Sequence, residues 1–304
     1  MQRSHKSMTL SECWDYYLGS LEEVKPKHVE ITRMVRKYSD NHLWDDTSWF
    51  LELKQTYKAS TWNPRKTWLK TCIDYCLSEG VITGRNLYAL LKNSSNGAEE
   101  DAIKPFSKAE ISKILEALES NAYCRKGSIY PHHHYVPFVS FLFLTGVRTG
   151  EAVALQWSDI NWDKKIITIS KTYSRTSNSN VRRLKATKTG VIRHIPLNDE
   201  LENVLTAATN PSRYVKGNFV FNGFRSKAID PDNFRERIWK PVLEALGIEY
   251  RYPYQSRHTV LSEVASKQGL LAAAKLAGHK NTEMVSRHYA RYTDEIQLPS
   301  LNDE

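Results

Sequence analysis

The first part of the chain alternates apolar and polar positions with the spacing of amphipathic helices. Apolar and aromatic residues recur at helical intervals in successive stretches, as they do on the buried face of a helix. The last of these stretches has Ser60 or Thr61 as an N-cap and Gly80 as a stop, and such residues mark helix ends. The pattern predicts an all-α N-terminal domain, residues 1–92, with helices at 10–21, 25–41, 47–58 and 60–80.

A second pattern begins after a polar break. Residues 93–103, NSSNGAEEDAI, have no periodicity and are predicted to be a linker. Ser107 and Glu110 then form a capping-box pair ahead of an apolar helical run. The stretch YVPFVSFLFLTG, 135–146, is almost wholly apolar, which indicates a helix that is buried on all sides. We expect a second domain, residues 104–292, to be built around this helix.

Two shorter stretches of the second domain have the character of strands. KKIITIS, 164–170, is rich in β-branched residues, and VIRHIPL, 191–197, alternates apolar and polar residues after Gly190. From Asp199 to Tyr292 the apolar spacing is again mostly helical. The second domain is therefore predicted to be mainly α with a small antiparallel β-sheet.

The charge of the chain favours a polyanionic partner. Lys and Arg number 43 against 34 Asp and Glu, a net charge of +9, which favours nucleic acid ahead of an anionic membrane. Between Lys164 and Asn198 nine residues are basic and none is acidic. This basic ribbon suits a phosphate backbone, although a solvated charged hairpin gives the same pattern. We favour contact with double-stranded DNA, made by Lys171, Arg175, Arg182, Arg183, Lys185 and Arg193.

Other features bear on compartment and metal binding. The chain opens with no apolar signal segment and holds no run of about 18 apolar residues. Cys72 and Cys76 are one helical turn apart without a second pair, so a helix face is favoured over a metal site and reduced thiols in a cytosol are expected. Three consecutive histidines, 132–134, cannot all face one metal from a helix. We interpret them as a loop and the start of a helix.

Four separated segments carry the remaining chemistry. They are TGVRTGEAVALQWSDI (145–160), KTGVIRHIPL (188–197), YQSRHT (254–259) and LAGHKNTEMVSRHY (276–289). Their order and spacing resemble the active-site motifs of the tyrosine recombinase, or phage integrase, family. The N-terminal helices and the stretch PFSKAEI, 105–111, resemble the core-binding domain of that family and the start of its catalytic domain, so the resemblance covers nearly the whole chain.

The resemblance implies both a fold and a reaction. A helical-bundle core-binding domain and an α+β catalytic domain would form a C-shaped clamp on DNA. A tyrosine would cleave a strand, form a 3′-phosphotyrosine and pass the strand to another 5′-hydroxyl, and no metal or other cofactor is implied. The expected enzyme is a cytoplasmic site-specific recombinase that integrates or excises a phage or mobile element. It would act as a homo-tetramer on two sites, with an accessory DNA-bending or directionality factor as a further partner.

Two arginines suit the charge that such a reaction develops. In-line attack on a phosphodiester adds negative charge to its non-bridging oxygens, and fixed cationic donors stabilise that charge. Arg148 follows the apolar helix, between Gly146 and Gly150, which let the backbone turn. Arg257 opens another helical stretch, where a surface arginine is the alternative. The alternative for Arg148 is a structural salt bridge to Glu151, to which the resemblance gives a supporting, orienting role.

The resemblance assigns the remaining catalytic roles. Lys188 would be the general acid that protonates the leaving 5′-oxygen, with a simple phosphate contact as the alternative role and Lys185 as the nearest competitor. His279 would bind the scissile phosphate or help to move the proton of the tyrosine. Tyr254 stands where the family usually has a histidine. A phenol donates a hydrogen bond but is no base near neutral pH, so the identity of the proton acceptor stays open.

The expected nucleophile is Tyr289. It lies ten residues after His279, and Tyr292 lies thirteen after. The commonest interval in the family is one residue shorter than the first of these and falls on His288 here, so one extra loop residue is expected and Tyr292 is the second choice. The tail, 293–304, holds three apolar residues among acids and is expected to dock on a neighbouring protomer, with a frayed terminus as the alternative. A non-catalytic DNA-binding protein on the same fold and a type IB topoisomerase are the competing functions.

Overall fold

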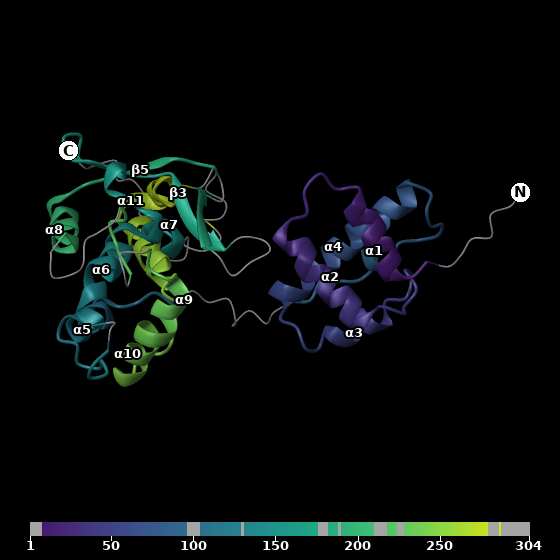
Figure 1. The fold of residues 1–304 in the computed structure, drawn as a ribbon, viewed down its shortest axis with the longest axis horizontal. Coiled ribbons are helices and arrows are strands. Elements are labelled where there is room, and N and C mark those ends of the chain that lie inside the picture. The colour runs from purple at the N-terminus through teal and green to yellow at the C-terminus, as the bar shows by residue number, and fades with distance from the viewer. Residues whose placement is uncertain are drawn as a thin grey trace, which may run out of the picture. The chain divides into compact units, whose positions relative to one another are not determined.

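The structure, a computed structural model, describes residues 8–95, 104–128, 131–175, 182–187, 190–209, 218–223 and 228–278, together with Ser286. These residues divide into two compact units, an N-terminal unit of residues 8–95 and a C-terminal unit that begins at residue 104 (Figure 1). Most of the predicted linker, 93–103, and the whole tail, 293–304, lie outside the described residues, so both stay predictions.

The N-terminal unit is built of helices. Aromatic side chains fill its core, where the rings of Phe50 and Trp62 stack with centroids 5.0 Å apart. The last long helix ends as predicted, with Gly80 at a φ of +67° after it, but its start was predicted wrongly. The helix begins at Ala59 because Lys58, in extended conformation, is the N-cap. The helices are α1 (Leu10–Gly19), α2 (Pro26–Tyr38), α3 (Ser48–Leu53), α4 (Ala59–Ser78) and the short η1 (Leu87–Ala89).

The C-terminal unit combines helices with short strands. The predicted capping box opens its first helix, where the Ser107 side chain accepts from the Glu110 amide and the Glu110 carboxylate accepts from the Ser107 amide. Its helices are α5 (Lys108–Glu119), η2 (His132–Tyr135), α6 (Val136–Thr145), α7 (Thr149–Ala154), η3 (Trp157–Asp159), α8 (Asp199–Ala208), α9 (Pro231–Phe234), the π-helical η6 (Arg235–Trp239), α10 (Lys240–Ala245) and α11 (Gln255–Ala277).

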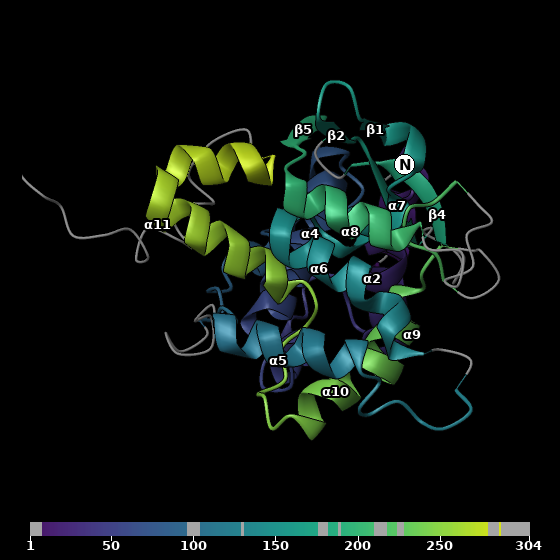
Figure 2. The same cartoon turned by 90° about the vertical axis from the view of Figure 1, so that its left-hand side faces the viewer.

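Helix α6 is the central helix of this unit, as its apolar sequence predicts. It contacts α5, α7, α8 and α11, and most of its side chains are buried. Helix α11 contains a kink at Gly269, whose φ of 84° and ψ of 166° are not helical, and Figure 2 shows its two parts meeting at a sharp bend. None of the helices within the described residues is long and apolar enough to cross a membrane.

The strands form two small antiparallel sheets. One has the order β1-β2-β5, and β3 pairs with β4 in the other. The stretches predicted as strands supply β2 and β5, whereas β3 and β4 come from the basic ribbon between them. The mainly α fold with a small antiparallel β component is confirmed. The strands are β1 (Ile160–Asn161), β2 (Ile166–Ile169), β3 (Lys171–Arg175), β4 (Arg182–Ala186) and β5 (Arg193–Pro196).

Candidate active site

The site is organised around a buried carboxylate at the start of α7. The chain turns at Gly146, whose φ of +61° ends α6 in the left-handed conformation, and Arg148 then caps α7. Glu151, one turn into the helix, is only 2% exposed. Its Oε2 accepts a hydrogen bond of 2.8 Å from the backbone amide of Arg148. The short turn therefore fixes a negative charge in the interior, directly beside the first candidate arginine.

Arg148 is partly exposed and only partly engaged. Its Nη1 donates to Glu151 Oε1 at 2.9 Å, and its side chain is 23% exposed. Among the described residues no other side-chain hydrogen bond of Arg148 occurs. The salt bridge to Glu151 that the sequence offered as an alternative thus exists, and it leaves Nε and Nη2 for a further partner. A structural and a ligand-binding role are compatible in this side chain.

Arg257 is buried between two helix ends. It lies in the first turn of α11, as expected, and is 1% exposed. Its Nη1 donates to the carbonyl oxygen of Gly146 at 2.9 Å, and its Nη2 donates to that of Ala277 at 2.7 Å. These carbonyls belong to the last turns of α6 and α11, where backbone acceptors lack helical partners and the helix dipole favours a cation. Arg257 therefore joins the segments that carry the first and the last motif.

Arg193 corrects a prediction. The sequence groups it with the cations that contact DNA, but it lies on the inward face of β5 and is 7% exposed. Its Nη2 donates to Glu151 Oε2 at 2.6 Å and its Nη1 to Glu151 Oε1 at 3.2 Å. A bidentate pair of this kind is the strongest geometry for an arginine and a carboxylate. Side chains alternate along a strand, so the partner of Arg193 comes from the interior and not from solvent.

The charges of this cluster act on one another. Burial alone would raise the pKa of the Glu151 carboxyl, but the hydrogen bonds and charges of Arg193 and Arg148 outweigh it and hold the pKa below its ordinary value. Burial lowers the pKa of Arg257, and the positive charges of Arg148 and Arg193 add to that effect. Three guanidiniums around one carboxylate leave an excess of positive charge, which is the electrostatic setting that a phosphodiester requires.

Comparison of the sequence with protein families agrees with these motifs. Residues 104–295 match the model described as "Phage integrase family". The chain belongs to the phage integrase family. A tyrosine recombinase XerC-like protein of Caldanaerobacter subterraneus subsp. tengcongensis (strain DSM 15242 / JCM 11007 / NBRC 100824 / MB4) is 24% identical over 286 residues, which cover 84% of this chain and 69% of the relative.

Solved integrase structures share the fold. A structure of the Tn1549 transposon integrase in complex with a circular intermediate DNA has a TM-score of 0.77 and 16% identity, with 96% of each chain covered. A crystal structure of a lambda integrase tetramer bound to a Holliday junction has a TM-score of 0.67 and 18% identity, covering 91% of this chain and 79% of the other. At these low identities the likeness shows that the chains share a fold.

Three residues that the integrase motifs single out lie outside the described residues. They are Lys188, His279 and Tyr289, and the side chain of Arg175 and the second-choice Tyr292 also lie outside them. Thr187 and Gly190, on either side of the gap that holds Lys188, are described, and the amide of Gly190 donates to the carbonyl oxygen of Thr187 at 2.9 Å. Gly278, before His279, has a φ of +67° and caps α11. The roles of these residues stay proposals.

Tyr254 lies at the N-terminal end of α11. It is the N-cap residue of that helix and is 41% exposed, and its ring packs edge-on against His258 with the centroids 5.2 Å apart. Its carbonyl oxygen accepts a hydrogen bond of 3.1 Å from the backbone amide of Arg257. An exposed phenol close to the buried arginine is placed to donate a hydrogen bond toward an anion at the cluster, which is the use that its chemistry allows.

Gly150 has a role other than the predicted one. It lies inside α7 and not in the turn before it. A Cβ atom at this position would lie 2.8 Å from Thr172 Oγ1 and 3.2 Å from the carbonyl oxygen of Tyr173, both on β3. The glycine therefore allows the hairpin of β3 and β4 to pack directly on the helix that carries Arg148 and Glu151. Sequence reasoning identified the residue but not this close approach.

The other cations of the basic ribbon differ in their surroundings. Lys171 Nζ lies 2.8 Å from Asp159 Oδ1, and Arg182 Nη2 lies 2.5 Å from Asp232 Oδ2. Arg183 and Lys185 are exposed on β4. They face the same side of the hairpin as Ser174 and Thr172, the residues opposite them in register. Since Thr172 is the residue nearest Gly150, this face of the hairpin is the one turned toward α7.

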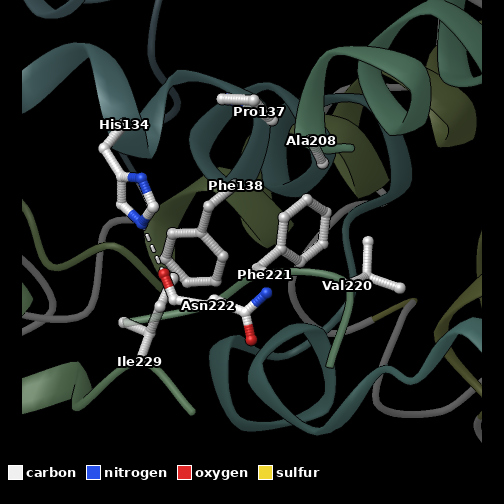
Figure 3. A pocket seen from close by; sticks show the side chains of 8 residues that line it. All are labelled: His134, Pro137, Phe138, Ala208, Val220, Phe221, Asn222 and Ile229. Atoms are coloured by element: carbon white, nitrogen blue, oxygen red, sulfur yellow. Dashed lines mark hydrogen bonds between the residues drawn. The ribbon is translucent and has the colours of Figure 1, made fainter. Parts of the chain in front are cut away.

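The histidine run lies apart from the arginine cluster. It forms η2 as expected, and His134 Nε2 is 2.5 Å from the carbonyl oxygen of Asn222 across a small pocket lined mainly by apolar side chains (Figure 3). Phe138 and Phe221 contribute two aromatic rings to its lining. No lining residue belongs to the four motifs. Among the described residues no group of three or more His, Cys, Asp or Glu is arranged to hold a metal ion.

Proposed function

We propose that this protein is a site-specific DNA recombinase of the integrase type, which cleaves and rejoins strands through a 3′-phosphotyrosine. The observation that carries this proposal is the convergence of Arg148 and Arg257, from distant motifs, on one buried cluster with Glu151. A cluster with excess positive charge and a partly exposed guanidinium can bind a phosphodiester. Membership of the phage integrase family supports the same reading.

The first chemical step is transesterification. The hydroxyl oxygen of Tyr289 attacks the scissile phosphorus, a phosphorus–oxygen bond forms, and the bond to the 5′-oxygen breaks. Negative charge grows on the non-bridging oxygens, and Arg148 and Arg257 stabilise it with fixed hydrogen bonds. Arg148 offers Nε and Nη2 for this purpose, and Tyr254 adds a neutral donor. Because a phosphodiester replaces a phosphodiester, the reverse attack by a 5′-hydroxyl of another strand completes strand transfer.

Two protons move in each step. The leaving 5′-oxygen takes one from Lys188, and the tyrosine hydroxyl loses one, with His279 as the proposed acceptor or relay. Lysine suits the acid role because neighbouring cations lower its pKa toward neutrality. Lys185 is the competing acid, since it projects from the hairpin face that is turned toward α7.

Two solved integrase structures support a proposal for the substrate and the assembly of this protein. The Tn1549 transposon integrase is solved with a circular intermediate DNA and lambda integrase as a tetramer on a Holliday junction. We infer that this protein likewise binds duplex DNA and acts as a tetramer on two sites in integration or excision of a mobile element, with an accessory bending or directionality factor. The N-terminal helical unit would provide the second half of a DNA clamp.

Two other functions predict different behaviour. A non-catalytic DNA-binding protein would bind the same DNA without a covalent intermediate, and Tyr254 at the usual histidine position is the feature in its favour. A type IB topoisomerase would form the intermediate but relax supercoiled DNA as a monomer. The solution mass of the DNA complex and the presence of a covalent species separate the three.

The decisive test uses a nicked duplex that carries the DNA flanking this gene in its source genome. The nick releases a short fragment after cleavage, so the covalent complex accumulates and survives SDS on a denaturing gel. We expect a covalent band with wild type and with Tyr292→Phe, and none with Tyr289→Phe. A band that is lost only in Tyr292→Phe would move the nucleophile to Tyr292. Tight binding with no band in wild type would favour the non-catalytic protein.

A further inference from the structure

The proposed strand-cleavage reaction assigns no role to the Arg193 side chain. It is one of the few buried charged groups of the C-terminal unit, and it belongs neither to the ribbon surface nor to the candidate catalytic set. It donates to both oxygens of the Glu151 carboxylate, and Arg148 donates to one of them, so that one carboxylate holds two guanidiniums. The pairing connects β5 with the turn that carries Arg148.

Arg193 also packs against the last motif. A Cβ atom at Gly278 would lie 3.1 Å from Arg193 Cδ and 3.5 Å from its Nη1, so the arginine fills the space beside the turn that leads to His279. Its buried Nε has no hydrogen-bond partner among the described residues. A buried and unpaired N–H is costly, and such a donor is retained where the side chain has another use.

We infer that Arg193 is a positioning residue for the proposed recombinase reaction: it compensates the charge of Glu151, so that Arg148 keeps its positive charge for the scissile phosphate. This inference rests on the proposed function. Without Arg193, the carboxylate would have Arg148 as its remaining direct ion-pair partner, and the pair would be electrically neutral where the phosphate binds. With Arg193 present, two guanidiniums around one carboxylate leave one uncompensated positive charge.

The charge argument makes a prediction that simple packing does not make. Arg193→Met keeps an extended apolar stem but leaves Arg148 to neutralise Glu151, and Glu151→Gln leaves two guanidiniums without an anion between them. Each single change therefore moves the net charge of the cluster away from its wild-type value, in opposite directions. The double variant Arg193→Met/Glu151→Gln restores the net charge of the cluster. If compensation is the role of Arg193, the second substitution rescues the first.

The experiment measures the rate of covalent complex formation on the nicked duplex, with protein in excess over DNA so that affinity does not enter. We expect Arg193→Met to be slower by about 10- to 100-fold, the usual effect of losing an outer partner of a site, and Glu151→Gln to be slowed as well. The double variant should recover at least tenfold relative to Arg193→Met. Arg125→Met, an exposed position, is the matched control and should react at the wild-type rate.

Thermal unfolding of each variant shows whether it is folded, and Arg193→Lys, which keeps the charge, should retain more activity than Arg193→Met. A wild-type rate in Arg193→Met, or a double variant no faster than Arg193→Met, would overturn the inference and leave the proposed function intact. Absence of any covalent complex with wild type would overturn the proposed function and this inference together.

Discussion

The pairing of Arg257 with two helix ends predicts that this arginine stabilises the fold as well as the reaction. Its two hydrogen bonds, of 2.9 and 2.7 Å, go to the carbonyl oxygens of Gly146 and Ala277. In Arg257→Met both bonds are lost and both carbonyls stay buried without that donor. Hydrogen bonds from a charged group contribute roughly 1.5–3 kcal/mol each, and relief of the desolvation cost of the guanidinium offsets part of the sum.

We therefore expect Arg257→Met to lower the free energy of unfolding of the C-terminal unit by about 2–4 kcal/mol. For a unit of this size the midpoint of thermal unfolding should fall by roughly 4–16 °C. Differential scanning calorimetry measures this shift, and hydrogen exchange localises it. The amides of Gly146 and Gly278, which cap α6 and α11, should exchange faster in the variant because the two helix ends separate more readily.

Arg148→Met is the matched control, since it removes a second arginine of the same proposed catalytic set. The Arg148 side chain is 23% exposed and, within the described part of the chain, bonds only to Glu151 in the first turn of α7, and Glu151 keeps Arg193 as a partner. Its loss should cost no more than about 1.5 kcal/mol. If Arg257→Met were as stable as Arg148→Met, with unchanged exchange at the two caps, the structural role assigned to Arg257 would be wrong.

Two further predictions concern packing and pH. Gly150→Ala places a methyl group 2.8 Å from Thr172 Oγ1, so β3 must move away from α7. We expect calorimetry to show a free energy of unfolding lower by about 1–3 kcal/mol, and a stability equal to wild type would contradict the close approach. Hydrogen bonds from Ser48 and His42 lower the pKa of Asp46 to about 2, so its stabilising contribution is complete above its unfolded pKa near ~3.9 and is lost as the pH falls toward 2. Acid titration of unfolding should show a weaker pH dependence in Asp46→Asn over that interval, and an unchanged dependence would assign the effect to other carboxyls.

The parts of the fold that the sequence predicts well are those decided by local interactions. The capping box of Ser107 and Glu110 lies within one turn, and the apolar stretch of α6 identifies a buried helix without reference to any neighbour. The start of α4 was wrong because a lysine, a residue without a capping side chain, takes the N-cap position by backbone conformation alone. Strands β3 and β4 were not predicted because their polar residues are held by pairing and by contact with α7, which no local pattern expresses.

The candidate site, too, was predicted only in part from the sequence. Arg148, Glu151 and Arg257 were found from motifs, and the structure brings them together. The burial of Arg193 was not foreseen, because its partner Glu151 is 42 residues away in the sequence and the charged residues of the surrounding ribbon are all basic. One signal was present: Arg193 occupies an inward position in the alternation of VIRHIPL. An arginine on the apolar side of a strand requires a buried anion. The strand alternation is therefore a better guide to the surroundings of Arg193 than the positive charge of the residues next to it in the sequence.

The same reasoning changes the electrostatic picture of the basic ribbon. Its lack of acidic residues is a property of the sequence segment and not of the surface, since acids from other elements face several of its cations: Glu202 faces Lys165, Asp159 faces Lys171, Asp232 faces Arg182 and Glu151 faces Arg193. A cation that already has a carboxylate partner must give up that interaction to bind a phosphate, whereas Arg183 is exposed on the hairpin face turned toward α7. Within the described part of the ribbon, the cations that could bind DNA without giving up a carboxylate are therefore fewer than the composition indicates.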